Sequence, residues 1–308
     1  MTLPAGRSSD TPLKLKKLVV MGGIMAQIVC VHGIAQQLKG PETLAVEWRT
    51  ALRDGMRLAG ANPHQLPPEE SVQVAFYGDL FRGREKGDSP FRLADIEEGV
   101  EADLVIAWAA AAGLDQPYAD QNRAEEKSGW APRSIQRSAE ALLRVPFFAR
   151  LTERSFVGAL KQVQWYLTEP STREAVRERV SRLLSSDTRL VIGHSLGSVV
   201  AYEVLCRTTL TSAPSFITLG SPIGLPKLVF DRLDPAPVNG QGSWPSATSW
   251  TNIADIHDIV ACVKNLSPLF GGRIEDIEVN NEALAHDIGP YFTARETGEA
   301  VLKALRAS

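Results

Sequence analysis

A serine flanked by glycines marks the part of the chain where nucleophilic chemistry is most strongly indicated. The stretch 189–200 reads RLVIGHSLGSVV, in which an apolar, β-branched run enters Gly193-His194-Ser195-Leu196-Gly197. This pattern predicts a strand before Ser195 and a helix after it, with the hydroxyl exposed on a sharp turn at the sheet edge. Glycines on both sides let strand and helix approach closely. The pentapeptide alone would also fit a tight turn with a capping serine, but its flanks favour a nucleophile elbow.

A serine hydroxyl attacks slowly unless a base removes its proton, and a histidine held by a carboxylate is the usual base. His286 is the histidine that follows the last expected strand, 274–279, and precedes the last expected helix, 294–305. Two acids, Asp255 and Asp258, follow the strand that ends near residue 253. Asp258 is favoured because it lies further past the strand, on a loop long enough to reach an imidazole, and Asp255 remains the alternative.

The negative oxygen of an acyl-transfer intermediate needs two main-chain amides. The N–H of Leu196, at the start of the expected helix, is the first candidate. The second should follow the first strand, where His32-Gly33-Ile34 is placed for it. We expect Ile34 to donate and Gly33 to support the turn and let the substrate oxygen approach.

Strands and helices that would position these residues alternate along the chain. An apolar strand at 26–31 is followed by a helix from Pro41 and a second strand at 71–77. The helix carries an apolar stripe at i, i+4 spacing, formed by Leu44, Trp48, Leu52 and Met56. Strand, helix, strand is a βαβ unit, which favours parallel pairing. Later strands are expected at 190–192, 215–219, 250–253 and 274–279.

From about residue 80 to 169 the alternation stops and the sequence is mostly helical, with helices expected over 93–112, about 134–150 and 154–168. This predicts an inserted cap over one end of the sheet. The bulky residues of this cap could line an apolar substrate pocket or could pack the cap onto the core. They are Trp108, Trp130, Phe147, Phe148, Phe156, Trp165 and Tyr166. A Pro- and Gly-rich loop at 222–245 could form a second wall of the cleft.

Length and composition bound the remaining possibilities. The 308 residues are enough for one large α/β domain, expected over 25–308, after a flexible tail at 1–24. A net charge of −3 with scattered charges does not favour nucleic acid or an anionic membrane as a partner, so the expected partner is a small acyl substrate. The longest apolar run, 104–114, is too short to span a bilayer. Three widely spaced cysteines, Cys30, Cys206 and Cys262, form no disulfide framework and suit a reducing, cytoplasmic compartment.

These residues together resemble the α/β-hydrolase superfamily, most closely its bacterial serine hydrolases of the lipase and esterase type. The resemblance covers the chain from residue 26 to the end, outside the helical insert. It is carried by Val-His-Gly-Ile at 31–34, Gly-His-Ser-Leu-Gly at 193–197, Gly-Ser-Pro-Ile-Gly at 220–224, Trp-x-Asn-Ile at 250–253, Asp-x-x-Asp-x-Val at 255–260, and His286 followed by Tyr291.

The resemblance implies an eight-stranded, mostly parallel sheet flanked by helices, a Ser-Asp-His triad and no cofactor. It also supports Asp258 as the acid, since the acid of the family lies where Asp-x-Val occurs. Two features depart from the family. The insert precedes the nucleophile, whereas many relatives place their lid later, and Ile259 stands where a proline commonly follows the acid.

Three classes of function fit the sequence. The first is a serine hydrolase that cleaves a carboxylic ester, with thioesterase, amidase or acyltransferase chemistry on the same triad as its neighbours. The second is a metal-dependent hydrolase that uses His257, Asp258, His286 and Asp287, although adjacent side chains point apart. The third is a hydrolase fold that binds a ligand without turnover. The first is the prediction. The sequence leaves acyl specificity and oligomeric state open, and an apolar cap permits a lipid-like substrate without requiring one.

Overall fold

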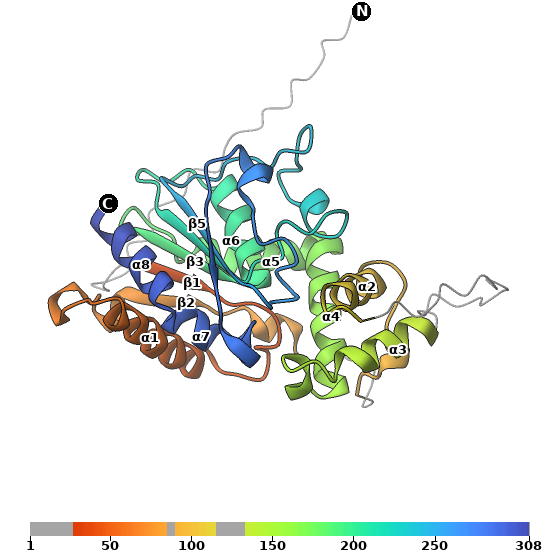
Figure 1. The fold of residues 1–308 in the computed structure, drawn as a ribbon. Coiled ribbons are helices and arrows are strands. Elements are labelled where there is room, and N and C mark those ends of the chain that lie inside the picture. Colours follow the sequence, from red (N-terminus) through yellow and green to blue (C-terminus); the bar gives the residue numbers. More distant parts are fainter. Residues whose placement is uncertain (1–26, 85–89, 115–132, 308) are drawn as a thin grey trace, which may run out of the picture.

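A single parallel sheet organises the part of the chain that the computed structural model describes, residues 27–84, 90–114 and 133–307. The expected tail at 1–24 lies outside these residues. The strands follow the order β2-β1-β3-β4-β5-β6, and every neighbouring pair is parallel (Figure 1). They are β1 (Ile28–Val31), β2 (Val72–Ala75), β3 (Leu190–His194), β4 (Ser215–Leu219), β5 (Trp250–Asp255) and β6 (Glu275–Val279).

The predicted parallel sheet flanked by helices is confirmed, but the eight strands that the resemblance implies are not found. The described residues contain six strands. The described chain between 93 and 181, where further strands could have stood, forms helices and turns.

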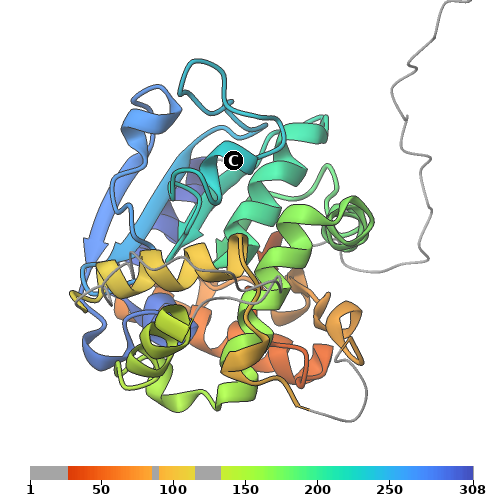
Figure 2. The ribbon, with the colours of Figure 1, turned by 90° about the vertical axis from the view of Figure 1, so that its right-hand side faces the viewer.

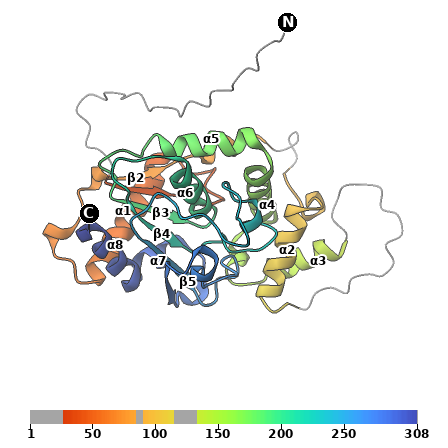
Figure 3. The same cartoon turned by 90° about the horizontal axis from the view of Figure 1, so that it is seen from above.

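Helices cover both faces of the sheet. The α-helices are α1 (Pro41–Leu58), α2 (Val100–Ala111), α3 (Arg133–Leu142), α4 (Glu153–Thr168), α5 (Pro170–Ser181), α6 (Leu196–Arg207), α7 (Ile288–Thr293) and α8 (Arg295–Ala307). Helices α1, α7 and α8 lie on one face and α5 and α6 on the other (Figures 1 and 3). Within the described chain, no helix is both long and apolar enough to cross a bilayer.

The apolar run of β1 is buried on both faces because its side chains alternate between two cores. Ile28 and Cys30 pack with α1 and α8, whereas Val29 and Val31 pack with α6 and the insert. The apolar stripe expected on α1 lies in the first of these cores, and all four of its residues are buried there. The continuous apolar sequence of this strand therefore reflects a sheet with helices on both sides.

The region between β2 and β3 is helical, as expected for 80–169. Helices α2 and α3 lie at the side of the molecule opposite α1 and α8 (Figures 1 and 3), and in Figure 2 they lie in front of the strands. The helix expected over 93–112 is shorter and begins at Val100, after the positive-φ residue Gly99. The helix expected over 134–150 ends at Leu142.

A buried carboxylate ties this insert to the helix that follows the elbow. Glu203 of α6 is fully buried and accepts a hydrogen bond from the hydroxyl of Tyr166 of α4 at 2.5 Å. The guanidinium groups of Arg173 and Arg177, both on α5, also contact it, the latter at 2.6 Å. A buried charge is tolerated only when it is paired and hydrogen-bonded, and Glu203 meets both conditions. The cap is therefore anchored beside the elbow through α4 and α5.

The strand order places the best position for a site at the ends of β1 and β3. From β1 the chain goes to β2 on one side and then to β3 on the other. In open parallel sheets ligands bind at such a reversal, in the crevice at the carboxyl ends of the strands. The loops that leave β1 and β3 here begin with His32 and Ser195.

Candidate active site

Ser195 lies on a sharp, strained turn between β3 and α6. Its φ of 54° and ψ of −132° are unusual for a residue with a side chain. Its N–H donates to the carbonyl of Leu219 at 3.0 Å, and the N–H of Ser198 donates to its carbonyl at 3.0 Å. A Cβ at Gly193 would lie 2.4 Å from the Cα of Ser198, and one at Gly197 would lie 2.2 Å from the carbonyl oxygen of Val31. Both glycines are therefore required by the close approach of strand, loop and helix.

The structure brings Ser195, His286 and Asp258 into one hydrogen-bonded series. The Nε2 atom of His286 is 2.9 Å from the Oγ of Ser195, and its Nδ1 atom is 2.7 Å from the Oδ2 of Asp258. All three side chains are buried. They come from the loops after β3, β5 and β6, whose parallel arrangement places their carboxyl ends at one edge of the sheet.

The carboxylate of Asp258 is saturated with donors. Its Oδ1 accepts the N–H groups of Val260 at 2.9 Å and Ala261 at 3.2 Å, and its Oδ2 also accepts the hydroxyl of Tyr291 at 2.8 Å. Burial alone would raise the pKa of this acid, but the charge and hydrogen bond of His286 and the donors around it lower the pKa below its usual value. Asp258 therefore lies in the environment of an ionised carboxylate.

Asp255, the alternative acid, has other partners. Its Oδ1 accepts the N–H of His257 at 2.7 Å and its Oδ2 accepts the N–H of Asn281. These contacts join the loops after β5 and β6. Asp255 is fully buried and holds two loops together, whereas Asp258 reaches the imidazole.

The loop after β1 lies directly against Ser195. A Cβ at Gly33 would lie 2.6 Å from the Cβ of Ser195, so the backbone there can approach only because residue 33 is glycine. Leu196 is the first residue of α6, where the N–H groups lack intrahelical acceptors. The structure thus places Leu196 and Gly33 beside Ser195, and Ile34 follows Gly33 in the same loop.

Gln162 of α4 braces this loop, and sequence reasoning missed it. Its Oε1 accepts the N–H of Ala35 at 3.1 Å, and its Nε2 donates to the Oε1 of Gln37 at 3.1 Å. The side chain is buried, so the contact links the cap to the β1 loop. A glutamine in an amphipathic helix gives no sequence signal for such a role.

Two further buried histidines support the site. His194 is the last residue of β3, and its Nε2 lies 2.9 Å from the main-chain oxygen of His286, to which it must donate. Burial lowers the pKa of His194 to about 3. The Nε2 of His32 accepts the N–H of Tyr77 at 3.1 Å, and burial lowers the pKa of His32 to about 4. Both rings are therefore neutral near pH 7 and serve as fixed hydrogen-bonding groups.

These neutral rings should make the fold sensitive to acid. The stability that they supply is fully present above the unfolded histidine pKa of about 6.5 and is lost as pH falls. The cause is that these histidines bind protons in the unfolded chain, whereas the buried rings of the folded chain stay neutral. The loss continues to about pH 4 for His32 and about pH 3 for His194. By pH 5 we expect a loss of about 2 kcal/mol per ring in the free energy of unfolding, measured by urea titration.

His194→Asn should flatten this dependence, and His64→Asn, which changes an exposed histidine, should keep the wild-type slope. A free energy of unfolding that stays constant between pH 7 and 4.5 would contradict neutral buried rings.

A pocket of about 510 Å³ opens beside the imidazole. The cap contributes the end of α2 and the segment 145–147, and the sheet edge contributes the loops after β5 and β6, which carry Asp258 and His286. The ring of Phe147 meets the ring of His286 edge to face, with centroids 5.0 Å apart. The pocket therefore borders the His286 and Asp258 side of the series, between the cap and the sheet edge, and Ser195 is not one of its lining residues.

The bulky cap residues divide between the two roles left open by the sequence. Phe147 lines the pocket, and Trp165 is partly buried over Phe81. Trp130 lies outside the described residues. The remainder are buried in the core, namely Trp108, Phe148, Phe156 and Tyr166.

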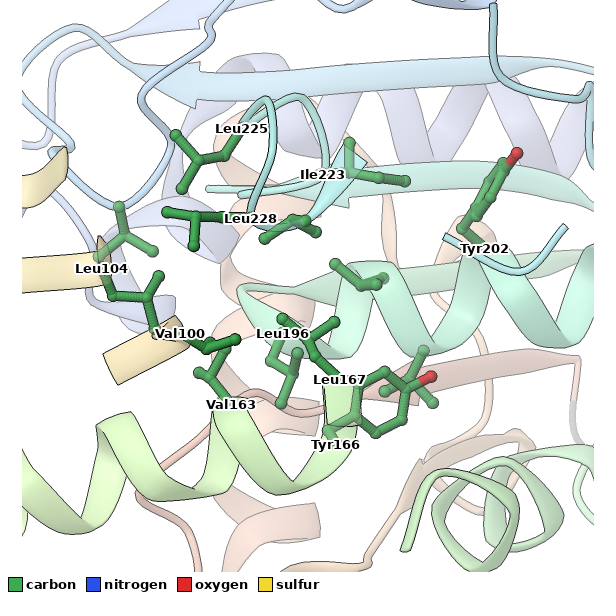
Figure 4. Packing of buried hydrophobic residues seen from close by; sticks show 14 of the residues in the cluster. Val100, Leu104, Val163, Tyr166, Leu167, Leu196, Tyr202, Ile223, Leu225 and Leu228 are labelled. Atoms are coloured by element: carbon green, nitrogen blue, oxygen red, sulfur yellow. The ribbon is translucent and has the colours of Figure 1, made fainter. Parts of the chain in front are cut away.

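The loop at 222–245 closes the apolar core beside Leu196, the residue that follows Ser195. Figure 4 shows its Leu225 and Leu228 facing Leu104 of α2, with Val163 of α4 close to Leu196. Most of the side chain of Leu196 is thus covered by apolar groups. Hydrogen bonds and charges act more strongly in such a poorly solvated region than in water.

The residues proposed for a metal site do not gather around one point. Among the described residues, His, Cys, Asp and Glu side chains form no group of three or more suited to a metal ion. Asp287 instead forms an ion pair with Arg150 of the cap at 2.9 Å, and Asp258 and His286 bind each other.

Comparisons with known proteins do not place the chain in a family. No protein-family model matches it, and no curated protein matches it. Its function must therefore be inferred from its own residues and their geometry.

Proposed function

We propose that the chain is a serine hydrolase of the α/β-hydrolase superfamily that cleaves a carboxylic ester through an acyl-enzyme. The observation that carries the proposal is the series from Ser195 Oγ to His286 Nε2 at 2.9 Å and from His286 Nδ1 to Asp258 at 2.7 Å. The strained backbone at Ser195 and the chain order Ser, Asp, His support the same conclusion.

The geometry supports the following steps. His286 Nε2 takes the proton of Ser195 as its oxygen attacks the ester carbonyl, and the ionised Asp258 stabilises the imidazolium. The negative oxygen would be held by the N–H of Leu196 and an amide of the loop at 33–34. His286 then gives its proton to the leaving alcohol oxygen, and water, activated by the same imidazole, releases the acid.

The mixed lining of the pocket supports a small acyl substrate with a substantial apolar part. Its cap side is apolar, with Val145 and Phe147, and its sheet side includes Lys264 and Glu282. Ester cleavage needs no cofactor in this scheme. The three cysteines, none of which forms a disulfide, support a reducing, cytoplasmic compartment.

A fluorophosphonate probe and a panel of p-nitrophenyl esters, thioesters and anilides test the proposal. We expect the native chain to be labelled, and the esters to be cleaved faster than the anilides, with activity unchanged by a chelator. Heat-denatured protein is the control for labelling. Thioester cleavage above ester cleavage would change the substrate class and keep the triad. Neither labelling nor turnover would indicate a binding module, and turnover lost to chelator without labelling would indicate a metal hydrolase.

A further inference from the structure

Tyr291 of α7 places a hydroxyl group at the acid end of the catalytic series. The side chain is fully buried. Its hydroxyl oxygen accepts the N–H of Asp255 at 2.8 Å and donates to the Oδ2 of Asp258 at 2.8 Å. That same Oδ2 lies 2.7 Å from the Nδ1 of His286. The phenol and the imidazole therefore share one carboxylate oxygen.

The direction of the phenolic hydrogen bond follows from its partners. The N–H of Asp255 can only donate, so the proton of Tyr291 must point to Asp258. Burial and the nearby carboxylates raise the pKa of Tyr291, which keeps this proton in place. The ring is also held by packing, since a Cβ at Gly220 would lie 3.0 Å from its Cε2 atom.

We propose that Tyr291 is a positioning residue that limits how strongly Asp258 attracts the imidazolium, and thereby sets the pH range in which His286 acts as a base. This rests on the proposed function. Each donor to a carboxylate withdraws negative charge from it and weakens its hold on a neighbouring cation. Without the phenol, Oδ2 would interact with His286 alone. The imidazolium would then be more stable and would lose its proton at higher pH.

Other charged or titratable groups face this pair and stay unchanged when Tyr291 is altered. Lys264, from the loop after β5, donates to the main-chain oxygen of Asp258 rather than to its carboxylate. The ring of His194 lies 4.9 Å from that of His286 and is neutral, with its pKa lowered to about 3 by burial. Further groups near the pair are Asp255, which is bound to main-chain amides, and the ion pair of Asp287 with Arg150. The side chains of His257, Cys262 and Glu282 line the same pocket as His286.

The test is the pH dependence of kcat/KM for a p-nitrophenyl ester. Tyr291→Phe keeps the ring and removes the donor. We therefore expect the acidic limb of the kcat/KM profile, where His286 loses its proton, to move to higher pH by about half a pH unit to one pH unit, with KM within about twofold of wild type. Incorporation of 3-fluorotyrosine at position 291 makes the phenol a stronger donor and should move the limb down. If Tyr291→Phe does not fold, the pH profile of the fluorotyrosine protein tests the proposal by itself.

Tyr202→Phe is the matched control. Tyr202 is also fully buried, and its hydroxyl donates to the main-chain oxygen of Ser243 at 2.8 Å, away from the triad. Its loss should leave the limb at the wild-type pH. A limb that does not move with Tyr291→Phe, or that moves the same way with both changes at position 291, would overturn the proposal.

A second readout separates this inference from the proposed function. The protonation of His286 is followed by NMR in the full chain labelled with ¹⁵N-histidine, and its resonance is identified by its absence in His286→Gln. We expect the midpoint to rise in Tyr291→Phe and to fall with fluorotyrosine. An unmoved midpoint overturns the role of Tyr291 whatever the activity. A moved midpoint in a chain that neither cleaves esters nor reacts with fluorophosphonate leaves that role standing and removes the proposed function.

Discussion

Ser195→Ala is expected to lower kcat/KM for a p-nitrophenyl ester by at least about 10³-fold and to abolish fluorophosphonate labelling. The substitution removes the oxygen that would form the acyl bond. It leaves in place the main-chain amides that would bind the negative oxygen, and these alone should support only a small residual rate. Within the described residues the buried hydroxyl forms one side-chain hydrogen bond, to His286 Nε2 at 2.9 Å. Its removal should therefore leave folding intact by circular dichroism and thermal melting.

The same loss is expected for His286→Ala, and the double variant should lose little more than either single variant. Residues that act as one unit show this non-additivity, because each step needs both the nucleophile and the base. Ser181→Ala on α5 is the control for a serine removed elsewhere. Losses that multiply in the double variant would show that Ser195 and His286 act independently, and retention of turnover by Ser195→Ala would refute the nucleophile.

Asp258→Asn is expected to lower kcat by about 10²- to 10⁴-fold, with folding preserved. The carboxylate fixes the proton on His286 Nδ1, which leaves Nε2 free to accept the proton of Ser195. An amide there can present its NH₂ group to Nδ1 and favour the wrong tautomer, and it cannot stabilise the imidazolium by charge. The measurement is kcat for the same ester, with the melting temperature recorded alongside.

Asp255→Asn is the matched control because it changes a second buried acid three residues earlier, at the end of β5. Its carboxylate binds the amides of His257 and Asn281, so its loss should lower the melting temperature and keep kcat within about tenfold of wild type. If Asp255→Asn abolished turnover and Asp258→Asn were silent, the acid of the proposed triad would be Asp255.

Many of the strands and helices could be predicted from local sequence alone. The strand at 215–219 and the apolar stripe of α1 lie where the sequence predicts them. Apolar and β-branched residues dominate the strand, and apolar residues recur at i, i+4 spacing in the helix. Helix boundaries in the insert were less predictable. Positive φ at Gly99 and the turn after Leu142 depend on how α2 and α3 pack against the rest of the chain.

The supporting contacts of the site could not be read from the sequence. Gln162, His194 and Tyr291 act through partners between 33 and 127 residues away along the chain. A glutamine, a histidine or a tyrosine with such a role has the same local context as one that only packs. Their partners become neighbours only when parallel strands and the cap bring distant loops to one edge.

The sequence by itself determined that a serine follows a buried strand, that glycines flank it, and that an acid and a histidine follow later strands in that order. These features are local, since a sharp turn tolerates few residue types and a buried strand needs apolar ones. Only the tertiary structure decided that Asp258 rather than Asp255 reaches His286, because both acids leave the same strand and differ only in the path of the loop. The distance across that loop is a property of the assembled sheet, and local sequence does not encode it.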